Sequence, residues 1–214
     1  MKKLAIFDVD YTITSRETLQ ELYKYAISED KRNIKYAPRA IYSGLMYVLG
    51  RYDEKNVKEK FLKFLVGMDE NKLKDFVCRF YENRLNKILY KDSIEKMKEL
   101  KKEGYDIYLI SASPEFYLNE LYKIEEVDNI IGTRFVIKDG KFTGKMFGKN
   151  CKGEEKVNRL KEVLTKEKIE VDFLKSYMFS DSLSDLPLLN LVGNPYLINY
   201  KKKNKVKFKI LNWK

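Results

Sequence analysis

The sequence predicts an α/β protein in which a parallel sheet has helices on both faces and carries an inserted helical domain. From residue 92 onward, short apolar runs alternate with amphipathic helical stretches, the pattern of parallel strands joined by helices. Before that point, residues 15–89 show apolar side chains at helical spacing and no strand pattern. We therefore expect an α/β core formed by residues 1–14 and 89–214, with a helical bundle at residues 15–88 inserted after the first strand.

The first strand is predicted at residues 4–7, and it ends in two aspartates, Asp8 and Asp10. Alternate residues of a strand share a face, so both carboxylates project the same way from its end. Taken alone, they would suit a polar turn equally well. The helical stretch that follows is interrupted at residues 36–38 and 50–53, where proline and glycine break the periodicity.

The second half of the chain supplies the remaining elements of the core. Gly104 closes the helix expected over residues 93–103. An Asp-Gly pair at residues 139–140 indicates a hairpin turn. The expected elements are a helix over 93–103, a strand over 106–110, a helix from 114 to about 122, a hairpin over 133–146, a helix over 153–168, a strand over 176–180, a short helix over 185–191 and a strand over 196–199.

Composition limits the chemistry that the chain performs. It has 214 residues, two cysteines and no histidine, which excludes a histidine base, a Ser-His-Asp triad and the usual histidine zinc site. Two cysteines are too few for a disulfide framework, and with no signal sequence in view they favour a cytoplasmic location. No segment approaches the roughly 20 apolar residues that span a bilayer, so we expect no membrane partner.

The formal net charge of +11 favours anionic partners, and nucleic acid, anionic lipid and small phosphorylated molecules all qualify. The simpler interpretation is a solvated, lysine-rich surface. The basic run from Lys201 to Lys209 is expected to be a solvated tail or edge in the same sense. Because the basic residues are dispersed and match no nucleic-acid motif, we do not expect nucleic acid as a partner.

Three predicted strands end in polar residues. Asp8 and Asp10 follow the first strand, Ser111 follows the second, and Asp181 follows the third, with Asp185 four residues later. The carboxyl ends of parallel strands meet at one edge of a sheet, so these side chains are expected to converge. Carboxylates in such a place bind a hard cation or act as a nucleophile.

With these residues the chain resembles the phosphatases of the haloacid dehalogenase superfamily, in the branch (subfamily IB) of phosphoserine phosphatase-like hydrolases. The segment Asp8-Val9-Asp10-Tyr11-Thr12 matches the first motif, Asp-x-Asp-x-Thr, and Ser111 matches the second. A lysine within Cys151–Lys156 matches the third motif, and Asp181 and Asp185 match the acidic pair of the fourth. The resemblance covers the whole chain and implies a Rossmann-like three-layer core, with the helical insert in the place of the family's cap.

The resemblance implies a role for each carboxylate. Asp8 is expected to be the nucleophile that forms an aspartyl-phosphate. Asp10 is expected to protonate the leaving oxygen and then to deprotonate the water that hydrolyses the intermediate. The implied cofactor is Mg²⁺, held by Asp8, the backbone carbonyl of Asp10, Asp181 and, directly or through other ligands, Asp185. Such a cation offsets the repulsion between a carboxylate nucleophile and a phosphate dianion.

The same resemblance implies a phosphate site formed by the Ser111 hydroxyl, the Ala112 amide and a lysine. Ser113 is expected only to begin a turn. Two lysines compete for the third role: Lys156 fits the Gly-Glu-Glu-Lys pattern of the branch, and Lys152 fits the lysine-glycine of phosphoserine phosphatases. They lie four residues apart on one helical face. We favour Lys156 and expect the other to be a solvated surface lysine.

Several positions bear on the substrate. Tyr11 stands where the family has a small residue, so its ring would narrow the pocket or pack under the cap. Glu17 stands where phosphoserine phosphatases bind the substrate's amino group, although a glutamate there also suits a helix N-terminus. Lys58 or Lys60 occupies the region of the expected carboxylate-binding arginine, and lysine does not reproduce a bidentate clamp. Ser184 replaces a frequent asparagine, which would loosen the support of the metal ligands.

The leading hypothesis is a Mg²⁺-dependent phosphomonoester hydrolase that acts on a small phosphorylated metabolite beneath a mobile cap. Phosphoserine-like compounds, phosphoethanolamine, phosphocholine and sugar phosphates are open as substrates. The same site would also serve a phosphotransferase or a phosphomutase. The alternative outside enzyme chemistry is a basic nucleic-acid-binding protein, for which the net charge and the basic run at residues 201–209 are the arguments. The sequence does not indicate an oligomeric state.

Overall fold

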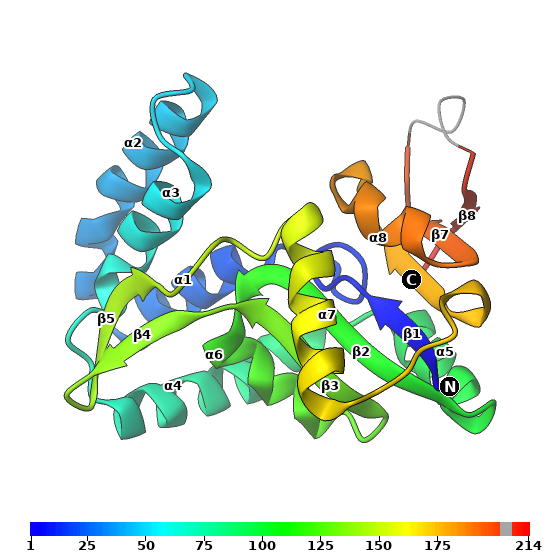
Figure 1. The fold of residues 1–214 in the computed structure, drawn as a ribbon. Coiled ribbons are helices and arrows are strands. Elements are labelled where there is room, and N and C mark those ends of the chain that lie inside the picture. The colour runs from blue at the N-terminus through cyan, green and yellow to red at the C-terminus, as the bar shows by residue number, and fades with distance from the viewer. Residues whose placement is uncertain (202–206) are drawn as a thin grey trace.

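Six parallel strands form the sheet at the centre of the molecule (Figure 1). The computed structural model describes residues 1–201 and 207–214. Across these residues the strand order is β3-β2-β1-β6-β7-β8, and each neighbouring pair runs parallel. The α/β class and the parallel sheet predicted from the sequence are therefore confirmed. The strands are β1 (Lys3–Phe7), β2 (Tyr105–Pro114), β3 (Val127–Thr133), β6 (Tyr177–Ser180), β7 (Asn194–Ile198) and β8 (Lys209–Leu211).

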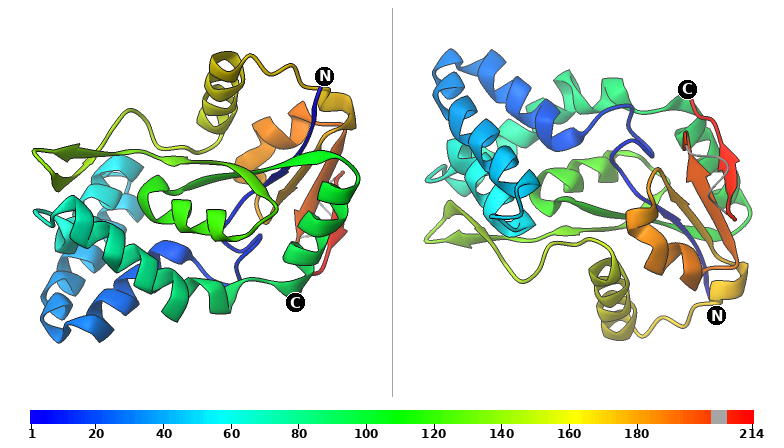
Figure 2. Two further views of the ribbon diagram at one scale, coloured as in Figure 1. Left: turned by 90° about the horizontal axis from the view of Figure 1, so that it is seen from below. Right: turned by 90° about the horizontal axis from the view of Figure 1, so that it is seen from above.

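Strand β1 is buried on both faces, which is why its sequence is an uninterrupted apolar run. Ala5 and Phe7 belong to a core cluster that includes side chains of the helical insert and of α5 (Lys91–Lys102). Leu4 and Ile6 belong to a second cluster, with α7 (Glu154–Glu167) and α8 (Leu186–Leu191). Figure 2 shows α5 on one side of the sheet and α7 and α8 on the other. The alternation along one strand thus joins the three layers of the core.

The insert between β1 and α5 contains four α-helices. Local chemistry explains where they begin: the side chains of Asp53 and Asp69 accept backbone N–H groups at the starts of α3 and α4, and Pro38 stands in the first turn of α2. Figure 1 shows α2 and α3 projecting together at one end of the molecule. The four helices are α1 (Thr18–Glu29), α2 (Ala37–Val48), α3 (Glu54–Phe61) and α4 (Glu70–Asn83).

The predicted hairpin is confirmed as β4 (Phe135–Lys138) and β5 (Lys141–Met146), paired antiparallel. Its turn residues Asp139 and Gly140 have φ angles of +51° and +70°, the left-handed conformations that a two-residue turn of this kind requires. The hairpin also bonds to the helical insert, because the Phe142 backbone accepts the N–H of Gly67 and donates to the carbonyl of Met68.

Several expected elements differ from the structure. The sequence did not indicate β3, because Asp128 and Asn129 interrupt its apolar pattern, and it did not indicate β8. Strand β2 continues through residue 114, and the helix expected there is only one turn, α6 (Glu115–Leu118), followed by a 3-10 turn. Residues 202–206 of the predicted basic tail lie outside the described residues. Within the described part of the chain, no helix is both long enough and apolar enough to cross a membrane.

Gly132, near the end of β3, provides a test of how tightly the sheet edge is packed. A Cβ atom at this position would lie 2.8 Å from the Ser113 carbonyl oxygen and 2.9 Å from the Cα of Glu115. We expect Gly132→Ala to lower the free energy of unfolding by about 1–3 kcal/mol, because backbone must move to admit the methyl group. The measurement is urea denaturation followed by circular dichroism.

Gly44→Ala is the matched control, since a Cβ atom there meets nothing within 4 Å and the position lies inside α2. This variant should be more stable than the wild type by roughly 0.5–1 kcal/mol, as alanine favours the helix. Equal stability of Gly132→Ala and the wild type would contradict the packing described here.

Candidate active site

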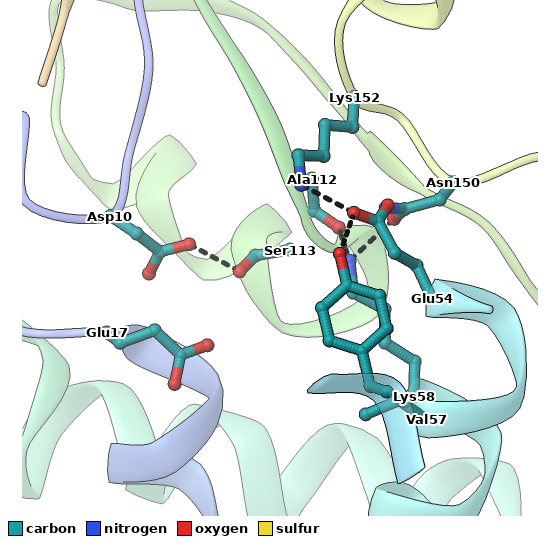
Figure 3. A pocket seen from close by; sticks show the side chains of 10 residues that line it. Asp10, Glu17, Glu54, Val57, Lys58, Ala112, Ser113, Asn150 and Lys152 are labelled. Atoms are coloured by element: carbon teal, nitrogen blue, oxygen red, sulfur yellow. Dashed lines mark hydrogen bonds and ion pairs between the residues drawn. The ribbon is translucent and has the colours of Figure 1, made fainter. Parts of the chain in front are cut away.

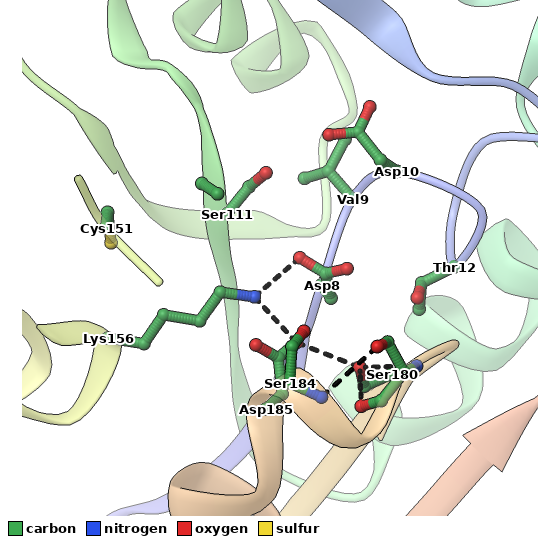
Figure 4. A network of polar contacts seen from close by, with 12 residues as sticks. Asp8, Val9, Asp10, Thr12, Ser111, Cys151, Lys156, Ser180, Ser184 and Asp185 are labelled. Carbon is green, nitrogen blue, oxygen red and sulfur yellow. Dashed lines mark hydrogen bonds and ion pairs between the residues drawn. The ribbon is translucent and has the colours of Figure 1, made fainter. Parts of the chain in front are cut away.

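The carboxyl ends of β1, β2 and β6 meet at one edge of the sheet, and polar residues converge there (Figure 4). In the strand register, Phe7 pairs with Leu109 and with Phe179. Asp8 lies one residue beyond this level of the sheet, and Ser111 and Asp181 lie two residues beyond it. The Thr12 hydroxyl accepts the backbone N–H of Asp181 at 2.8 Å, which ties the loop after β1 to the end of β6. The three strand ends that the sequence singled out therefore come together in space.

Lys156 is the cation at the centre of this edge. Its side chain is 2% exposed, and its Nζ lies 2.7 Å from Asp8 Oδ1 and 2.7 Å from Asp185 Oδ2. The Ser180 hydroxyl lies 2.9 Å from the same Asp185 oxygen. Gly153, with a φ of +57°, forms the turn that starts α7 and brings Lys156, in the first turn of that helix, to the strand ends. Of the two lysines weighed from the sequence, Lys156 is the one that reaches the carboxylates.

Burial disfavours the charged forms in this cluster, and ion pairing opposes that effect. Burial raises the pKa of Asp8 to about 8, although the Lys156 ammonium acts in the other direction. Burial also raises the pKa of Asp181 to about 6, with a further contribution from the Asp185 carboxylate. Burial disfavours the Lys156 ammonium, but Asp8 and Asp185 together raise its pKa above the ordinary value. One buried ammonium thus pairs with two of the three carboxylates, Asp8 and Asp185, and a second cation would relieve the remaining negative charge.

The donor set suits Mg²⁺. Asp185 Oδ1 is buried and has no hydrogen-bond partner in the described structure. No three acidic or cysteine side chains of residues 1–201 and 207–214 gather closely enough to form a metal site by themselves. However, Mg²⁺ commonly takes only one or two protein carboxylates and completes its shell with water and substrate phosphate. Asp8 and Asp181, on adjoining strand ends, and Asp185, at the start of α8, fit that kind of binding.

Figure 3 shows part of a second set of contacts, which holds Asp10. Its Oδ1 accepts the backbone N–H of Thr18 at 2.6 Å, and its Oδ2 accepts the Ser113 hydroxyl at 2.6 Å. Thr18 Oγ1 in turn lies 2.9 Å from the buried Tyr117 hydroxyl. The expectation that Ser113 only begins a turn is wrong, because its buried hydroxyl positions Asp10. The turn-forming sequence Ser-Pro masked this role.

The end of β2 presents the expected phosphate-binding groups. Ser111 is buried, and its Oγ accepts the N–H of Ser113 at 3.0 Å, which leaves the hydroxyl proton available for an oxygen ligand. The Ala112 carbonyl accepts the Thr133 hydroxyl, and Ala112 lines the cavity described below. Figure 4 shows Ser111 beside Asp8 and Lys156, and phosphate binding by Ser111 and the Ala112 amide stays a prediction.

Tyr11 does not take the place expected of it, and the expectation for Ser184 stays a prediction. Tyr11 has a φ of +57°, its ring is 46% exposed, and it is not among the residues that line the cavity. The ring therefore neither narrows the cavity nor packs under the helical insert, and the left-handed backbone explains why a small residue would suit this position. Ser184 is also exposed, and its backbone N–H bonds to the Ser182 hydroxyl.

A cavity of about 270 Å³ separates this sheet edge from the helical insert (Figure 3). Core residues from the strand ends and insert residues from α2 and α3 face each other across it. The lining residues are Asp10, Glu17, Tyr47, Glu54, Val57, Lys58, Ala112, Ser113, Asn150 and Lys152.

Glu54 links the insert to the core loop before α7. Its carboxylate accepts the Lys152 ammonium, the Asn150 amide and, at 3.0 Å, the Tyr47 hydroxyl. Lys152 was expected to be a solvated surface lysine if it did not bind phosphate. Its side chain is 42% exposed, in agreement with that expectation, and it also forms an ion pair with Glu54 across the cavity.

Lys58, one turn after Glu54, points into the same cavity. Its ammonium donates to the Ala112 carbonyl and, at 2.6 Å, to Asn150 Oδ1. Burial lowers the pKa of Lys58 to about 8. Lys60, the other lysine considered for this region, lies over the Tyr52 ring instead, 3.4 Å from its centroid. Lys58 is therefore the cation that the insert contributes.

Glu17 fits the interpretation as a helix-start residue and also faces the cavity, whereas binding of a substrate's amino group stays a prediction. Its side chain caps α1 by accepting the backbone N–H of Gln20 at 3.0 Å, and it also lines the cavity. Burial raises the pKa of Glu17 to about 7, and the Asp10 carboxylate adds to this effect. A cationic group on a ligand would stabilise the ionised form of this carboxyl group.

Sequence reasoning missed Glu54 and Asn150. Glu54 follows the capping residue Asp53 and looks like an ordinary acidic residue of a helix start. Asn150 lies in a short polar loop, and only the three-dimensional structure shows that it contacts Glu54, Lys58 and Thr133. The polar loop immediately before Cys151–Lys156 was the available signal.

The chain is similar to known proteins in both sequence and fold. The profile of the haloacid dehalogenase-like hydrolase family matches residues 5–190. A histidinol-phosphatase of Neisseria meningitidis is 28% identical over 209 residues, covering 93% of this chain and 91% of that protein. A phosphoserine phosphatase of Methanocaldococcus jannaschii is 27% identical, covering 90% and 83%. The crystal structure of a protein of unknown function from Bordetella pertussis Tohama I superposes with a TM-score of 0.87 at 20% identity, covering 99% and 98%.

The two lysines should differ sharply in their effect on stability. Lys156→Met would leave Asp8 and Asp185 buried without their cation, and we expect it to lower the free energy of unfolding by about 3 kcal/mol. The loss should be smaller near pH 6 than near pH 8, since protonation of the carboxyl groups relieves the uncompensated charge.

Lys152→Met removes a partly exposed pair and should cost about 1 kcal/mol or less. Urea denaturation of both variants at the two pH values measures the difference. Equal losses for the two variants, or a loss in Lys156→Met that does not depend on pH, would argue against the buried ion cluster.

Proposed function

The chain belongs to the haloacid dehalogenase-like hydrolase family, and from this premise we propose that it is a Mg²⁺-dependent phosphomonoester hydrolase that works through an aspartyl-phosphate. The observation that carries the proposal is the position of Asp8, which is buried at a strand end, paired with Lys156 and adjacent to Ser111. A carboxylate held in this way suits nucleophilic attack on phosphorus. Residues 15–88 would act as the cap over the site.

Asp8 would carry out the first step. One of its carboxylate oxygens bonds to phosphorus as the bond between phosphorus and the ester oxygen breaks. The leaving oxygen takes a proton from Asp10, which the Ser113 hydroxyl and the Thr18 N–H hold in a fixed orientation. In the second step Asp10 takes a proton from water, the water oxygen bonds to phosphorus, and the bond to Asp8 breaks, which releases phosphate.

The phosphoryl group would be held by the Ser111 hydroxyl, the Ala112 amide and the Lys156 ammonium. Phosphoryl transfer is governed mainly by positioning and by compensation of charge, so a buried lysine in a fixed geometry is well suited to this task. Mg²⁺, held by Asp8, the Asp10 carbonyl, Asp181 and Asp185, would supply charge neutralisation between the nucleophile and the phosphate. The raised pKa values of Asp8 and Asp181 support a need for that additional cation.

The cavity indicates the kind of leaving group. Glu17 contributes a carboxylate that no cation of the described residues contacts, whereas Lys58 and Lys152 are engaged by protein oxygens and Glu54 is paired with Lys152. The lining includes no arginine, so a clamp for a substrate carboxylate is absent from it. These features favour a small phosphomonoester whose leaving group carries a cation. Such a substrate, together with a cytoplasmic location, stays a prediction.

The first test of this proposal is hydrolysis of p-nitrophenyl phosphate and of a panel of amino-alcohol, amino-acid, sugar and nucleotide phosphates with Mg²⁺. Asp8→Asn should reduce the rate by at least about 1,000-fold, because the nucleophile is lost. EDTA should abolish the wild-type activity, and added Mg²⁺ should restore it.

Folding of Asp8→Asn is checked by circular dichroism, which should be unchanged. If the wild type is inert across the whole panel, the hydrolase proposal fails. Transfer of phosphate to an added sugar or glycerol in preference to water would instead identify a phosphotransferase.

Glu17 predicts a pH dependence of substrate affinity. Because its pKa is about 7, the ionised fraction increases strongly between about pH 6 and about pH 8. The KM for phosphoethanolamine should therefore fall by about five- to tenfold over this range, relative to the KM for glycerol phosphate, whose leaving group is neutral.

Glu17→Gln should remove this difference between the two substrates and leave the rate of glycerol phosphate hydrolysis little changed. Parallel pH profiles for both substrates in the wild-type enzyme would show that Glu17 does not bind a cationic group. Steady-state kinetics at several pH values is the measurement.

A further inference from the structure

Helix α2 carries an apolar stripe that faces away from the protein. Ile41, Leu45, Val48 and Leu49 follow the spacing of one helical face, and their exposed fractions are 73%, 53%, 81% and 57%. The one fully buried residue of α2 is Ser43, about 200° around the helix from both Ile41 and Leu45. The helix therefore turns the small polar Ser43 inward and Ile41, Leu45 and Val48 outward.

The stripe lies on a projecting part of the molecule. Figure 1 shows α2 and α3 standing out at one end, beyond the β4–β5 hairpin. Ile34, in the 3-10 helix that precedes α2, adds another side chain that is 62% exposed. An apolar surface of this kind is unusual on an isolated protein and points to an interaction site.

The charges around the stripe indicate the partner. Residues 31–52 contain five basic residues and no aspartate or glutamate. Arg32 pairs with Asp30, outside this segment. The basic residues stand at both ends of the stripe, namely Lys31, Arg32, Lys35 and Arg39 before it or at its start, and Arg51 after it. An apolar helical face flanked by basic residues is typical of helices that lie in the surface of a membrane.

We propose that the α2 stripe, Ile41, Leu45, Val48 and Leu49, docks on the surface of a membrane that contains anionic lipid. The apolar side chains would enter the region between headgroups and acyl chains, and the flanking basic residues would contact lipid phosphates. A second copy of the chain is a poorer partner, since a symmetric pair would bring the same basic residues together. The sequence alone led us to expect no membrane partner because no segment spans a bilayer, but surface docking requires no such length.

The test is co-sedimentation with vesicles of phosphatidylcholine alone and of phosphatidylcholine mixed with phosphatidylglycerol. The full chain should bind the mixed vesicles, bind the neutral ones weakly, and dissociate as salt increases. The double variant Leu45→Asn with Val48→Asn should bind the mixed vesicles at least about tenfold more weakly, because it removes apolar contact and leaves every charge in place.

Leu174→Asn is the matched control, as Leu174 is 82% exposed but lies in the 3-10 turn before β6. This variant should bind like the wild type, and so should Asp8→Asn, which separates docking from the proposed hydrolysis. Circular dichroism verifies that the double variant is folded, as expected for exposed positions.

Three results would overturn the proposal. The first is a lack of sedimentation with mixed vesicles at low salt. The second is unchanged binding by the double variant, which would show attraction through net charge only. The third is a dimer in light scattering that the double variant abolishes, which would show that a second copy covers the stripe.

Discussion

The buried ammonium of Lys156 is the interaction on which the rest of the site depends. Burying one cation and two carboxylates is costly unless each has a partner, and here Lys156 contacts both Asp8 and Asp185 at 2.7 Å. These three residues come from the end of β1, the first turn of α7 and the start of α8. The electrostatic requirement therefore fixes the spatial relation of three elements that are distant in sequence, and the same contact leaves Asp185 with one unpartnered oxygen.

Asp10 belongs to a different network, and this separation explains how two aspartates two residues apart perform different chemistry. Asp8 lies among charged groups, whereas Asp10 accepts neutral donors, the Thr18 N–H and the Ser113 hydroxyl. The left-handed backbone of Tyr11 between Asp10 and Thr12 helps to form the turn in which the N–H groups of Thr12, Ile13 and Thr14 all approach the Val9 carbonyl. The turn thus directs the two carboxylates into separate surroundings.

The residues that could be predicted from the sequence are those that belong to strand ends. Asp8, Ser111 and Asp181 follow apolar runs, and parallel strands necessarily bring such positions to one edge. The family resemblance also limited the lysine to two candidates, but burial was needed to choose Lys156. The contacts of Glu54 and Asn150 could not be predicted, because they join segments nearly 100 residues apart through side chains that also suit ordinary caps and loops. Strand β3 was missed for a related reason: the polar Asp128 within it is satisfied by Lys101 and by the N–H of Ile107.

Helix α2 borders the cavity on one side and the outside of the molecule on the other. Tyr47 on one side of the helix reaches the cavity and bonds to Glu54, while Val48, the next residue, is among the most exposed apolar side chains of the described structure. Successive residues of a helix point about 100° apart, so a single turn faces both the cavity and the outside. Contacts of Glu54 with Lys152 and Asn150 join α3 to the core at the same end. Any partner that holds the outer face of α2 would therefore act on a helix whose inner side forms part of the cavity wall, and the position of the insert over Asp10 would become sensitive to that contact.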